Sequence, residues 1–304
     1  MFISISSVII DDIVLPDGST HMACLGGGGT HAVMGMRVWS KHVGLVANIG
    51  ADLPQELMER MESAFDVRGL HTLGPQTVRA WQLFEEDGKR TEILRTELVD
   101  FQPLKPKMKN FPDAYSDLTG VHLHGEGADI APWIPFLRQR GNPFILWEPW
   151  QRDCVPESRS ILVDILPVVD CVSPNLQEAR LMLGIENTKH ILKEFLNLGA
   201  KRVAVRAGAE GSYYADSDGN NYQIPAVKVI KIVDQTGAGN AYCGGLAVGF
   251  VLAEKPEEAV CMAAVSGSFP LEKFGAVFSL DKIEERAKER LKACREVFQK
   301  INAN

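Results

Sequence analysis

The hydrophobic and polar positions of the chain follow two periods that alternate along most of its length. Short apolar runs rich in β-branched residues indicate buried strands, and segments with an apolar residue every three or four positions indicate helices. This repeated order predicts a mainly parallel sheet with helices on both faces. The expected strands lie at 2–10, 42–52, 120–125, 143–149, 169–175, 201–208 and 211–216, and helices are expected at 53–65, 130–141, 176–184, 190–199 and 281–301.

Residues 79–97 depart from this order. Two stretches of alternating polar and apolar residues flank the dipeptide Asp87-Gly88, which favours a tight hairpin turn. Together with the segment at 12–20, this hairpin is expected to form a small β lid inserted in one domain that spans 1–304. An exposed edge of the hairpin offers a place for a second copy of the chain to pair, so we expect a homodimer through the lid.

Composition and charge exclude several classes of protein. Hydrophobic residues make up 45% of the chain and charged residues 23%, which is typical of a compact soluble protein. The net charge of −7, without a basic stripe, argues against nucleic acid as a partner. The apolar N-terminus lacks the positive region of a signal peptide, and the apolar run at 241–253 is too short to cross a bilayer, so no membrane partner is expected.

The cysteines and histidines give no metal-binding pattern. The six cysteines are scattered along the chain, and we expect reduced thiols in a cytoplasmic protein. His122 and His124 alternate on an expected strand, but no ligand spacing supports a metal site there.

The stretch VDQTGAGNAY at 233–242 is the most informative in the chain. Gly237, Ala238 and Gly239 can turn the backbone so that successive N–H groups point outward at the start of a helix, where phosphate oxygens bind. Such a turn can also simply join a strand to a helix. It is neither a Walker A loop nor a Rossmann fingerprint, so taken alone it leaves both interpretations open.

The wider pattern resembles the ribokinase or PfkB family of carbohydrate and nucleoside kinases. DQTGAGN at 234–240 is similar to the family's C-terminal signature D-T-x-G-A-G-D. Four more stretches resemble family motifs in the family's order: GGGGTHAV at 26–33, IGAD at 49–52, SPNLQEARLMLG at 173–184 and VAVRAGAEGSYY at 203–214. The resemblance implies a three-layer α/β/α ribokinase-like core with a β lid. It also implies Mg2+-assisted phosphoryl transfer from ATP to a hydroxyl of a sugar or nucleoside-like small molecule.

The resemblance places the acceptor near the N-terminal motifs. Asp11 corresponds to the family's sugar-binding acid, Gly27 belongs to the glycine signature, and His31 replaces a substrate-contacting Asn. Asp12 would serve in place of Asp11 if the register shifts by one residue, and both acids could instead be solvated turn residues. Because His31 is bulkier than Asn and can be charged, the preferred substrate stays open.

The resemblance places the nucleotide near Asn175, Glu178, Arg206 and Gly208. Glu178 would organise the water shell of Mg2+, with Asn175 beside it. The alternative is that Asn175 caps a helix whose third residue is Glu178. The small residues at 263–268 either contact the adenine or allow tight helix packing.

Asn240 stands where the family has the Asp that takes the proton from the acceptor hydroxyl. An amide can position a hydroxyl but is not a useful base, so a slow kinase is expected, because general base catalysis contributes about 10²- to 10⁴-fold. An Asn240→Asp substitution is expected to raise turnover. The alternative is a pseudokinase that binds nucleotide and sugar without turnover and has a regulatory or interaction role.

Overall fold

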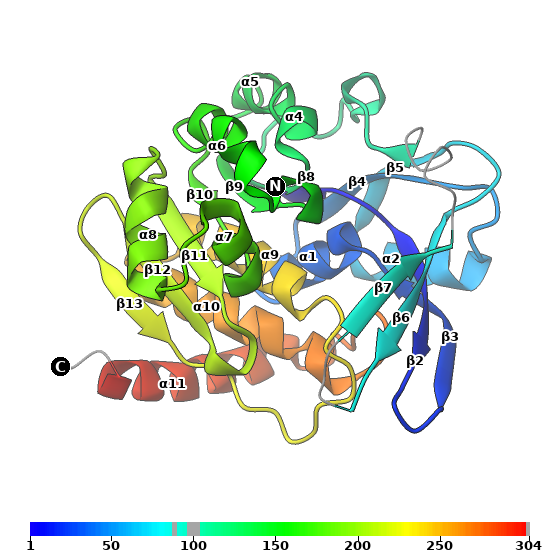
Figure 1. Ribbon diagram of the computed structural model, residues 1–304. Helices are drawn as coiled ribbons and strands as arrows, with labels where there is room; N and C mark the ends of the chain where they lie inside the picture. Colours follow the sequence, from blue (N-terminus) through cyan, green and yellow to red (C-terminus); the bar gives the residue numbers. More distant parts are fainter. Residues whose placement is uncertain (87–89, 96–103, 302–304) are drawn as a thin grey trace.

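The computed structural model describes residues 1–86, 90–95 and 104–301, which form a large sheet covered by helices and a smaller sheet beside it (Figure 1). The large sheet has nine strands in the order β13-β12-β11-β10-β9-β8-β1-β4-β5. Neighbouring strands from β11 to β5 are parallel, and the remaining pairs are antiparallel. The strands are β1 (Phe2–Ile5), β4 (Val43–Ile49), β5 (Asp66–Thr72), β8 (Gly120–Gly125), β9 (Phe144–Pro149), β10 (Cys171–Val172), β11 (Arg202–Arg206), β12 (Ser212–Asp216) and β13 (Asn221–Ile224).

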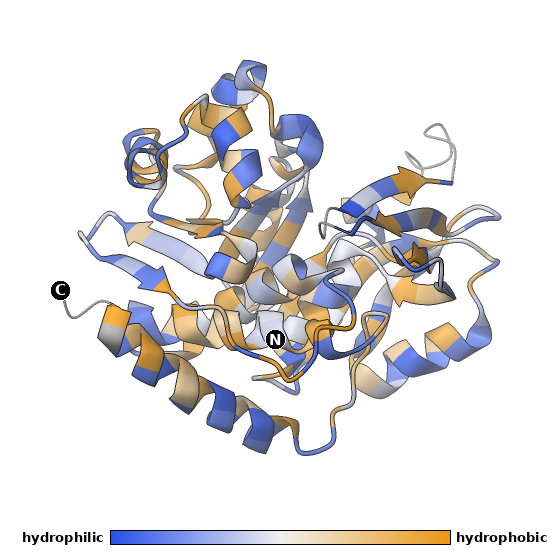
Figure 2. Cartoon of the chain, turned by 60° about the horizontal axis from the view of Figure 1, so that its bottom comes forward, coloured by the Kyte–Doolittle hydropathy of each residue, from blue (hydrophilic) through white to orange (hydrophobic). Residues whose placement is uncertain are grey.

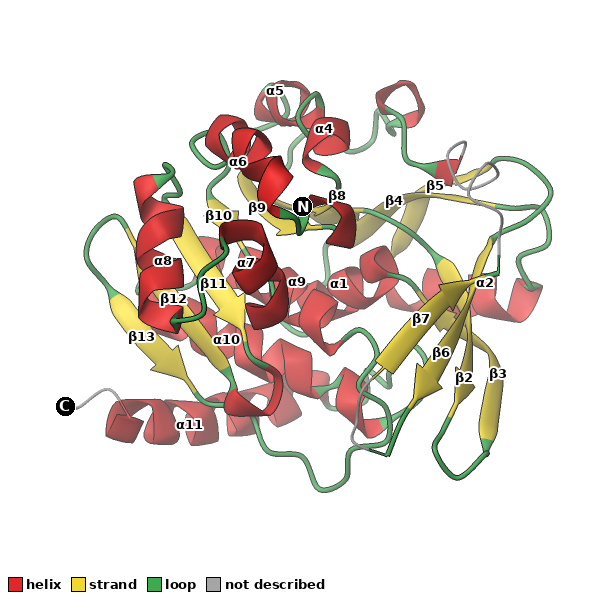
Figure 3. Cartoon of the chain, viewed as in Figure 1, coloured by secondary structure: helices red, strands yellow, loops and turns green. Residues whose placement is uncertain are grey.

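Helices lie on both faces of this sheet, which gives a three-layer α/β/α core (Figure 3). The helices of one face are α1 (Gly28–Arg37), α2 (Gln55–Ala64), α9 (Ala238–Leu252), α10 (Pro256–Ser268) and α11 (Ile283–Ile301). The helices of the other face are α4 (Gly127–Ile130), α5 (Trp133–Arg138), α6 (Arg159–Ile165), α7 (Leu176–Leu183) and α8 (Thr188–Asn197). Short 3₁₀ turns lie at Met108–Asn110, Gln151–Asp153, Pro156–Ser158, Gly208–Glu210 and Pro270–Glu272.

The strand side chains divide between two hydrophobic clusters. In β9, Leu146 packs in the cluster with α9, whereas Ile145 and Trp147 pack in the cluster on the opposite face. This alternation follows from the two-residue period of a strand. Because both faces are buried, the strands read as continuous apolar runs in the sequence.

The last helix shows the opposite sequence pattern. In α11, hydrophilic and hydrophobic residues alternate along the helix (Figure 2), and the buried positions recur every three or four residues. One stripe of α11 therefore packs on the core while the other side faces solvent. The buried positions are Ile283, Ala287, Leu291, Cys294 and Phe298.

The smaller sheet forms the lid. Its strands are β2 (Ile9–Val14), β3 (Thr20–Gly26), β6 (Val78–Phe84) and β7 (Arg90–Leu94), in the order β3-β2-β6-β7. β6 and β7 pair antiparallel, as the alternating pattern at 79–97 predicts, although the expected turn at Asp87-Gly88 lies outside the described residues.

One strand expectation was wrong. The apolar run at 2–10 is not one strand, because β1 ends at Ile5 and the chain crosses into the lid before β2 begins at Ile9. Asp11 and Asp12 therefore lie inside a lid strand and not at the end of a core strand. The run reads as continuous because both strands are buried, so hydrophobicity alone does not mark the break at Ser6 and Ser7.

Two further features concern the cysteines and the apolar character of the helices. All six cysteines are free thiols. Among the described helices, none combines the length and apolar character that a membrane span requires.

Candidate active site

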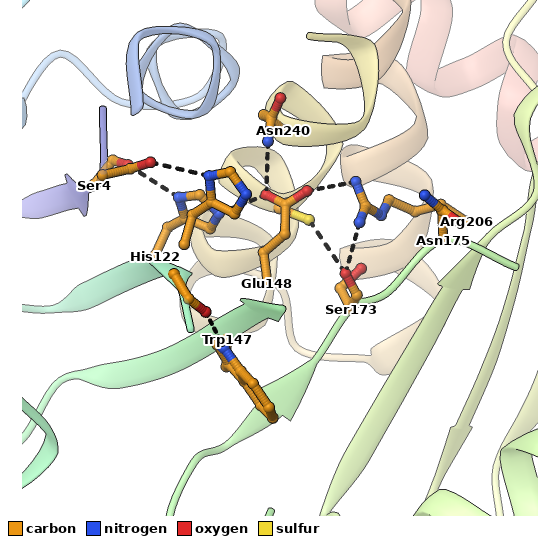
Figure 4. Close-up of polar contacts among 12 residues, drawn as sticks. Ser4, His122, Trp147, Glu148, Ser173, Asn175, Arg206 and Asn240 are labelled. Carbon is orange, nitrogen blue, oxygen red and sulfur yellow. Dashed lines mark hydrogen bonds and ion pairs between the residues drawn. The ribbon is translucent and has the colours of Figure 1, made fainter. Parts of the chain in front are cut away.

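The polar side chains of the core gather where the parallel strands end. His124 and Glu148 lie opposite each other in neighbouring strands β8 and β9, and Arg206 ends β11. The carboxyl edge of an open parallel sheet is where such folds bind ligands. The N-terminus of α9, with the residues 237–240, lies over the same edge and adds Asn240 to this group (Figure 4).

The 237–240 turn has the backbone of an anion-binding helix start. Gly237 caps α9 with φ 75° and ψ 0°, a left-handed conformation that glycine adopts readily. The Ala241 N–H donates to the Gly237 carbonyl at 2.9 Å, which closes the first helical turn. The N–H groups of that first turn have no acceptor inside the helix, and the helix dipole gives them partial positive charge. The predicted role of Gly237, Ala238 and Gly239 toward phosphate fits this geometry.

The glycine signature lies directly beside the 237–240 turn. Gly27 has φ 96° and precedes α1, so two of the four glycines belong to the helix and not to a loop. A methyl group on Gly28 would lie 2.3 Å from Nδ1 of His124 and 3.2 Å from Nδ2 of Asn240. The start of α1, the end of β8 and the start of α9 therefore border the same small region.

His31 packs against the 237–240 turn. A methyl group on Gly237 would lie 2.0 Å from Cγ of His31, so the imidazole fills the space behind that glycine. The ring is buried, its two nitrogens have no hydrogen-bond partner among the described residues, and burial lowers its pKa to about 3. His31 is therefore neutral at pH 7, and its contact with an acceptor stays a prediction.

Five residues from five elements form what we call the Glu148 network: Ser4, His122, Glu148, Arg206 and Asn240 (Figure 4). One carboxylate oxygen, Oε2, accepts from Nε2 of His122 at 2.8 Å and from Nδ2 of Asn240 at 3.0 Å. The other, Oε1, accepts from Nη1 of Arg206 at 2.5 Å. Oγ of Ser4 lies 2.9 Å from Nδ1 of His122 and completes the chain of contacts.

The charge of Glu148 is fixed by its neighbours. Burial alone would raise the pKa of this carboxyl, but the Arg206 guanidinium and the hydrogen bond from His122 outweigh burial and hold the pKa well below its usual range. Glu148 is consequently an ionised, fully hydrogen-bonded carboxylate with 3% of its surface exposed. It holds its partners in place and is a poor proton acceptor at neutral pH.

A metal ion does not fit this network. Ligand atoms of His122, Glu148 and Cys243 lie within 4.8 Å of one another, as in a metal site. However, the Arg206 cation already occupies Oε1, and burial keeps the pKa of the Cys243 thiol well above its ordinary value. A protonated thiol and a bound guanidinium both oppose a cation at this position.

Asn175 and Glu178 form the capping box that the sequence offered as an alternative. Oδ1 of Asn175 accepts from the Glu178 N–H at 2.8 Å, and Oε2 of Glu178 accepts from the Asn175 N–H at 2.7 Å. The same Oε2 lies 3.5 Å from Nη2 of Arg206, and burial raises the pKa of Glu178. Oε1 of Glu178 makes no hydrogen bond to another of the described residues, so this oxygen can still face the water shell of Mg2+.

The other residues that the resemblance places near the nucleotide are either packed inside the protein or exposed at its surface. Arg206 lies under α9, since a methyl group on Gly239 would lie 2.3 Å from its Nη1. Gly208 is exposed, and a methyl group on it would meet no described atom within 4 Å. In the small-residue segment 263–268, Oγ of Ser266 would contact a methyl on Gly245 at 2.2 Å, so tight helix packing accounts for this segment.

The lid contributes a second cluster of acids. Oδ1 of Asp11 accepts from Nε2 of Gln82 at 2.9 Å, and the same amide group donates to Oε1 of Glu92 at 2.9 Å. Burial raises the pKa of Asp11 to about 7, with Glu92 and Asp234 adding repulsion. Asp12 points the other way, where it pairs with Arg95 and accepts from the Ala23 N–H. The lid therefore turns Asp11, and not Asp12, toward Asp234, which precedes the 237–240 turn.

Sequence reasoning missed Glu148, the centre of the network. Its partners are 26, 58 and 92 residues away in the chain, so no local motif joins them. The available signal was an acid directly after the apolar run FILW, at the carboxyl end of a predicted parallel strand. Its neighbour Trp147, in contrast, is a buried core residue.

Comparison with known proteins places this geometry in a family. Residues 128–283, slightly more than half of the chain, match the model described as "pfkB family carbohydrate kinase". The chain belongs to the pfkB family of carbohydrate kinases. Among individual proteins, the chain is 26% identical over 275 residues to cytidine kinase of Thermococcus kodakarensis, an alignment that covers 89% of this chain and 96% of that protein.

Solved structures of other proteins share this fold. Ribokinase of Arabidopsis thaliana, solved with ribose and ATP, superposes with a TM-score of 0.72 at 18% identity and covers 96% of this chain and 98% of its own. An E. coli protein solved with ATP and Mg2+ superposes with a TM-score of 0.75 at 18% identity, over 95% of this chain and 99% of its own. The ribokinase-like core predicted from the sequence is thereby confirmed.

Proposed function

We propose that this pfkB-family protein transfers the terminal phosphoryl group of ATP to a hydroxyl of a sugar or nucleoside-like small molecule. The observation that carries the proposal is the position of the 237–240 turn, whose helix-start N–H groups lie at the carboxyl edge of the sheet beside Gly28 and Asn240. A phosphate held there would be within the region that the lid covers. Phosphoryl transfer depends mainly on such positioning and on electrostatic stabilisation.

The residues present fit ATP and Mg2+. Gly237 and Gly239 let the backbone of the 237–240 turn pack closely against His31 and Arg206, and the helix-start N–H groups of this turn would bind phosphate oxygens. Glu178 would hold the water shell of Mg2+ through Oε1, while Oε2 stays in the capping box. When bound, Mg2+ neutralises charge on the transferring phosphoryl group. Exposed Gly208 lies at the end of β11, where a nucleotide base would reach the surface.

The acceptor would bind between the lid and the 237–240 turn. Asp11 and Gln82 offer acceptor and donor groups of the kind that bind hydroxyls, and Oε1 of Gln82 is buried without a partner among the described residues. A polyhydroxyl ligand would satisfy that oxygen. The named relatives, a cytidine kinase and a ribokinase, support a sugar or nucleoside as the class of acceptor.

Proton transfer is the step for which Asn240 is poorly suited. His124 is the substitute base that the geometry favours, because its ring borders the same point of Gly28 as Asn240. Burial lowers the pKa of His124 to about 4, so the imidazole is neutral at pH 7 but weakly basic. We therefore expect turnover below that of family members with an Asp, by up to the 10²- to 10⁴-fold that general base catalysis contributes.

The proposal is tested with ATP labelled in its terminal phosphate, Mg2+ and a panel of neutral sugars and nucleosides. The expected result is slow appearance of label in one acceptor class. No label above a protein-free control, with every acceptor at high protein concentration, would contradict the proposal.

A pseudokinase is the second candidate, and one observation favours it. The amide of Asn240 is held by an ionised Glu148 that is itself a poor base, so the position next to the acceptor lacks the family's proton acceptor. Under this candidate Mg2+ and ATP raise the melting temperature by mass action, yet no acceptor is labelled. Absence of both binding and transfer would contradict both candidates.

A further inference from the structure

The contact between Asn240 and Glu148 makes a negative charge at position 240 unfavourable. Nδ2 of Asn240 lies 3.0 Å from Oε2 of a buried, ionised carboxylate. An Asp at 240 would place a second carboxylate oxygen at nearly that distance. Two carboxylates sharing one site cannot both ionise easily, and the pKa of one is strongly raised.

The same contact sets the orientation of the Asn240 amide. The nitrogen faces Glu148 because a carboxylate accepts hydrogen bonds and cannot donate them. Figure 4 shows the amide oxygen of Asn240 on the side away from Glu148. That oxygen is the acceptor that Asn240 can offer to a substrate hydroxyl at the 237–240 turn.

We propose that Glu148 is the positioning residue for Asn240. The carboxylate of Glu148, in strand β9, supplies the negative charge that an Asp at position 240 of helix α9 would otherwise supply. The inference rests on the proposed function. In this arrangement Asn240 is the required partner of Glu148, because an acid at 240 keeps its proton while Glu148 is ionised. The geometry thus revises the expectation that Asn240→Asp alone raises turnover at neutral pH.

The groups around Glu148 support this assignment of the charge. The guanidinium of Arg206 needs a carboxylate in direct contact to balance its charge. Oε1 of Glu148 lies 2.5 Å from Nη1 of Arg206, whereas Oε2 of Glu178 lies 3.5 Å from Nη2. Within the Glu148 network, Arg206 is the one permanent cation and already pairs with Glu148, while Arg90 of β7 acts from the lid on Glu178 and Asp234. The titratable and charged groups that face Glu148 are His122 and His124 from β8, Arg206 from β11, Cys243 from α9 and Glu178 from α7.

The test is a double-mutant cycle with Asn240→Asp, Glu148→Gln and the double variant, in the full-length protein. The first measurement is the free energy of unfolding in urea between pH 4 and pH 8. In N240D the folded pKa of the new acid is raised, so the folded state binds more protons than the unfolded state and stability falls as pH rises. The folding equilibrium constant is expected to drop about tenfold for each unit by which that pKa is raised.

The double variant removes the repulsion. The amide introduced by E148Q can accept from Arg206 through its oxygen and donate through its nitrogen to the carboxylate introduced by N240D, while His122 changes tautomer and donates to Ser4. The loss of stability with rising pH is therefore expected to disappear when E148Q is added to N240D. As a matched control, Asp216→Asn removes a buried carboxylate at the opposite edge of the sheet and is expected to show no coupling to N240D.

The second measurement is kcat against pH with the best acceptor. In N240D the acid limb is expected at higher pH than in the double variant. The double variant is expected to turn over at least about tenfold faster than wild type at pH 7, because its carboxylate at position 240 is then ionised and can act as the base. If Glu148 had only a structural role, the acid limb of kcat would lie at the same pH in N240D and in the double variant. The expected KM for ATP is unchanged.

The outcomes separate this inference from the proposed function. If neither the wild type nor any variant is active, the kinase proposal fails, and the unfolding cycle still decides the link between Glu148 and residue 240. If N240D does not fold but the double variant does, the repulsion is supported. If neither folds, Asn240→Ala replaces them, and the inference requires a fall in kcat without a change in KM. A pH-independent stability of N240D, or the same loss with rising pH in the double variant, would overturn the inference.

Discussion

The two sides of the 237–240 turn differ in how their polar groups are satisfied. On the sheet side, both carboxylate oxygens of Glu148 are hydrogen-bonded within the chain and the charges of Glu148 and Arg206 balance, although Nε of Arg206 has no partner among the described residues. On the lid side, both ring nitrogens of His31 and Oε1 of Gln82 are buried without a partner in the described residues. The first side is preorganised by the protein itself, whereas the second is the side that we propose a ligand completes. Substitutions that remove partners should therefore harm stability on the sheet side and binding on the lid side.

The largest effect is expected from Glu148→Ala. Removal of this carboxylate leaves Arg206 as a buried charge without its closest partner and frees the Asn240 amide, which should cost about 3–5 kcal/mol of unfolding free energy. Because the folded pKa of Glu148 is below its unfolded value, its contribution is present above the unfolded pKa and is lost as the pH falls. Because this loss takes place below the unfolded pKa, urea unfolding at pH 7 and at about pH 3 measures both effects. Glu157→Ala, at an exposed glutamate, is the control and should change stability little.

Asp11→Asn is expected to raise the free energy of unfolding, whereas Glu148→Ala lowers it. The folded pKa of Asp11, about 7, is above its ordinary value of 3.8, so wild-type stability is lost as the pH rises through this interval. The variant should be more stable than wild type by about 2–4 kcal/mol at pH 8 and equal to it near pH 4. At the same time its affinity for the acceptor should fall. Asp17→Asn, at an exposed lid residue, should show no gain. Equal stability of Asp11→Asn and wild type at pH 8 would contradict the buried lid acid.

Gly239→Val should separate phosphate binding from folding. The new side chain would clash with Arg206, so the start of α9 and its N–H groups would have to shift, at a cost of about 1–3 kcal/mol. The rise in melting temperature on addition of ATP and Mg2+ should be abolished. Gly219→Ala replaces a glycine with positive φ in open space and should lower stability without changing that rise. A normal response of Gly239→Val to ATP would argue that this turn only joins two elements.

His124→Gln should have the smallest effect on stability, within about 1 kcal/mol, because glutamine can keep a hydrogen bond to Ser6. Its kcat should fall at least tenfold if the imidazole takes the proton. A comparison of kcat and KM at pH 7 distinguishes the two effects. Unchanged kcat would remove His124 as the substitute base.

Much of this architecture could be predicted from the sequence because it depends on local patterns. The strand and helix alternation and the lid hairpin at 79–97 follow from periodicity, and the 237–240 turn follows from small residues before a helix. The break between β1 and β2 could not be predicted, because two buried strands in succession have the same apolar pattern. The Glu148 network could not be predicted for another reason. Its members come from separate strands and a helix, and only the register of the parallel sheet brings them together.

The most direct test is a crystal structure with a non-hydrolysable ATP analogue and Mg2+. The account predicts that the two terminal phosphates accept hydrogen bonds from the N–H groups of residues 237–240, with the terminal phosphorus facing the lid and Glu178 in the water shell of the ion. Phosphates bound elsewhere, with that helix start in contact with solvent alone, would contradict it.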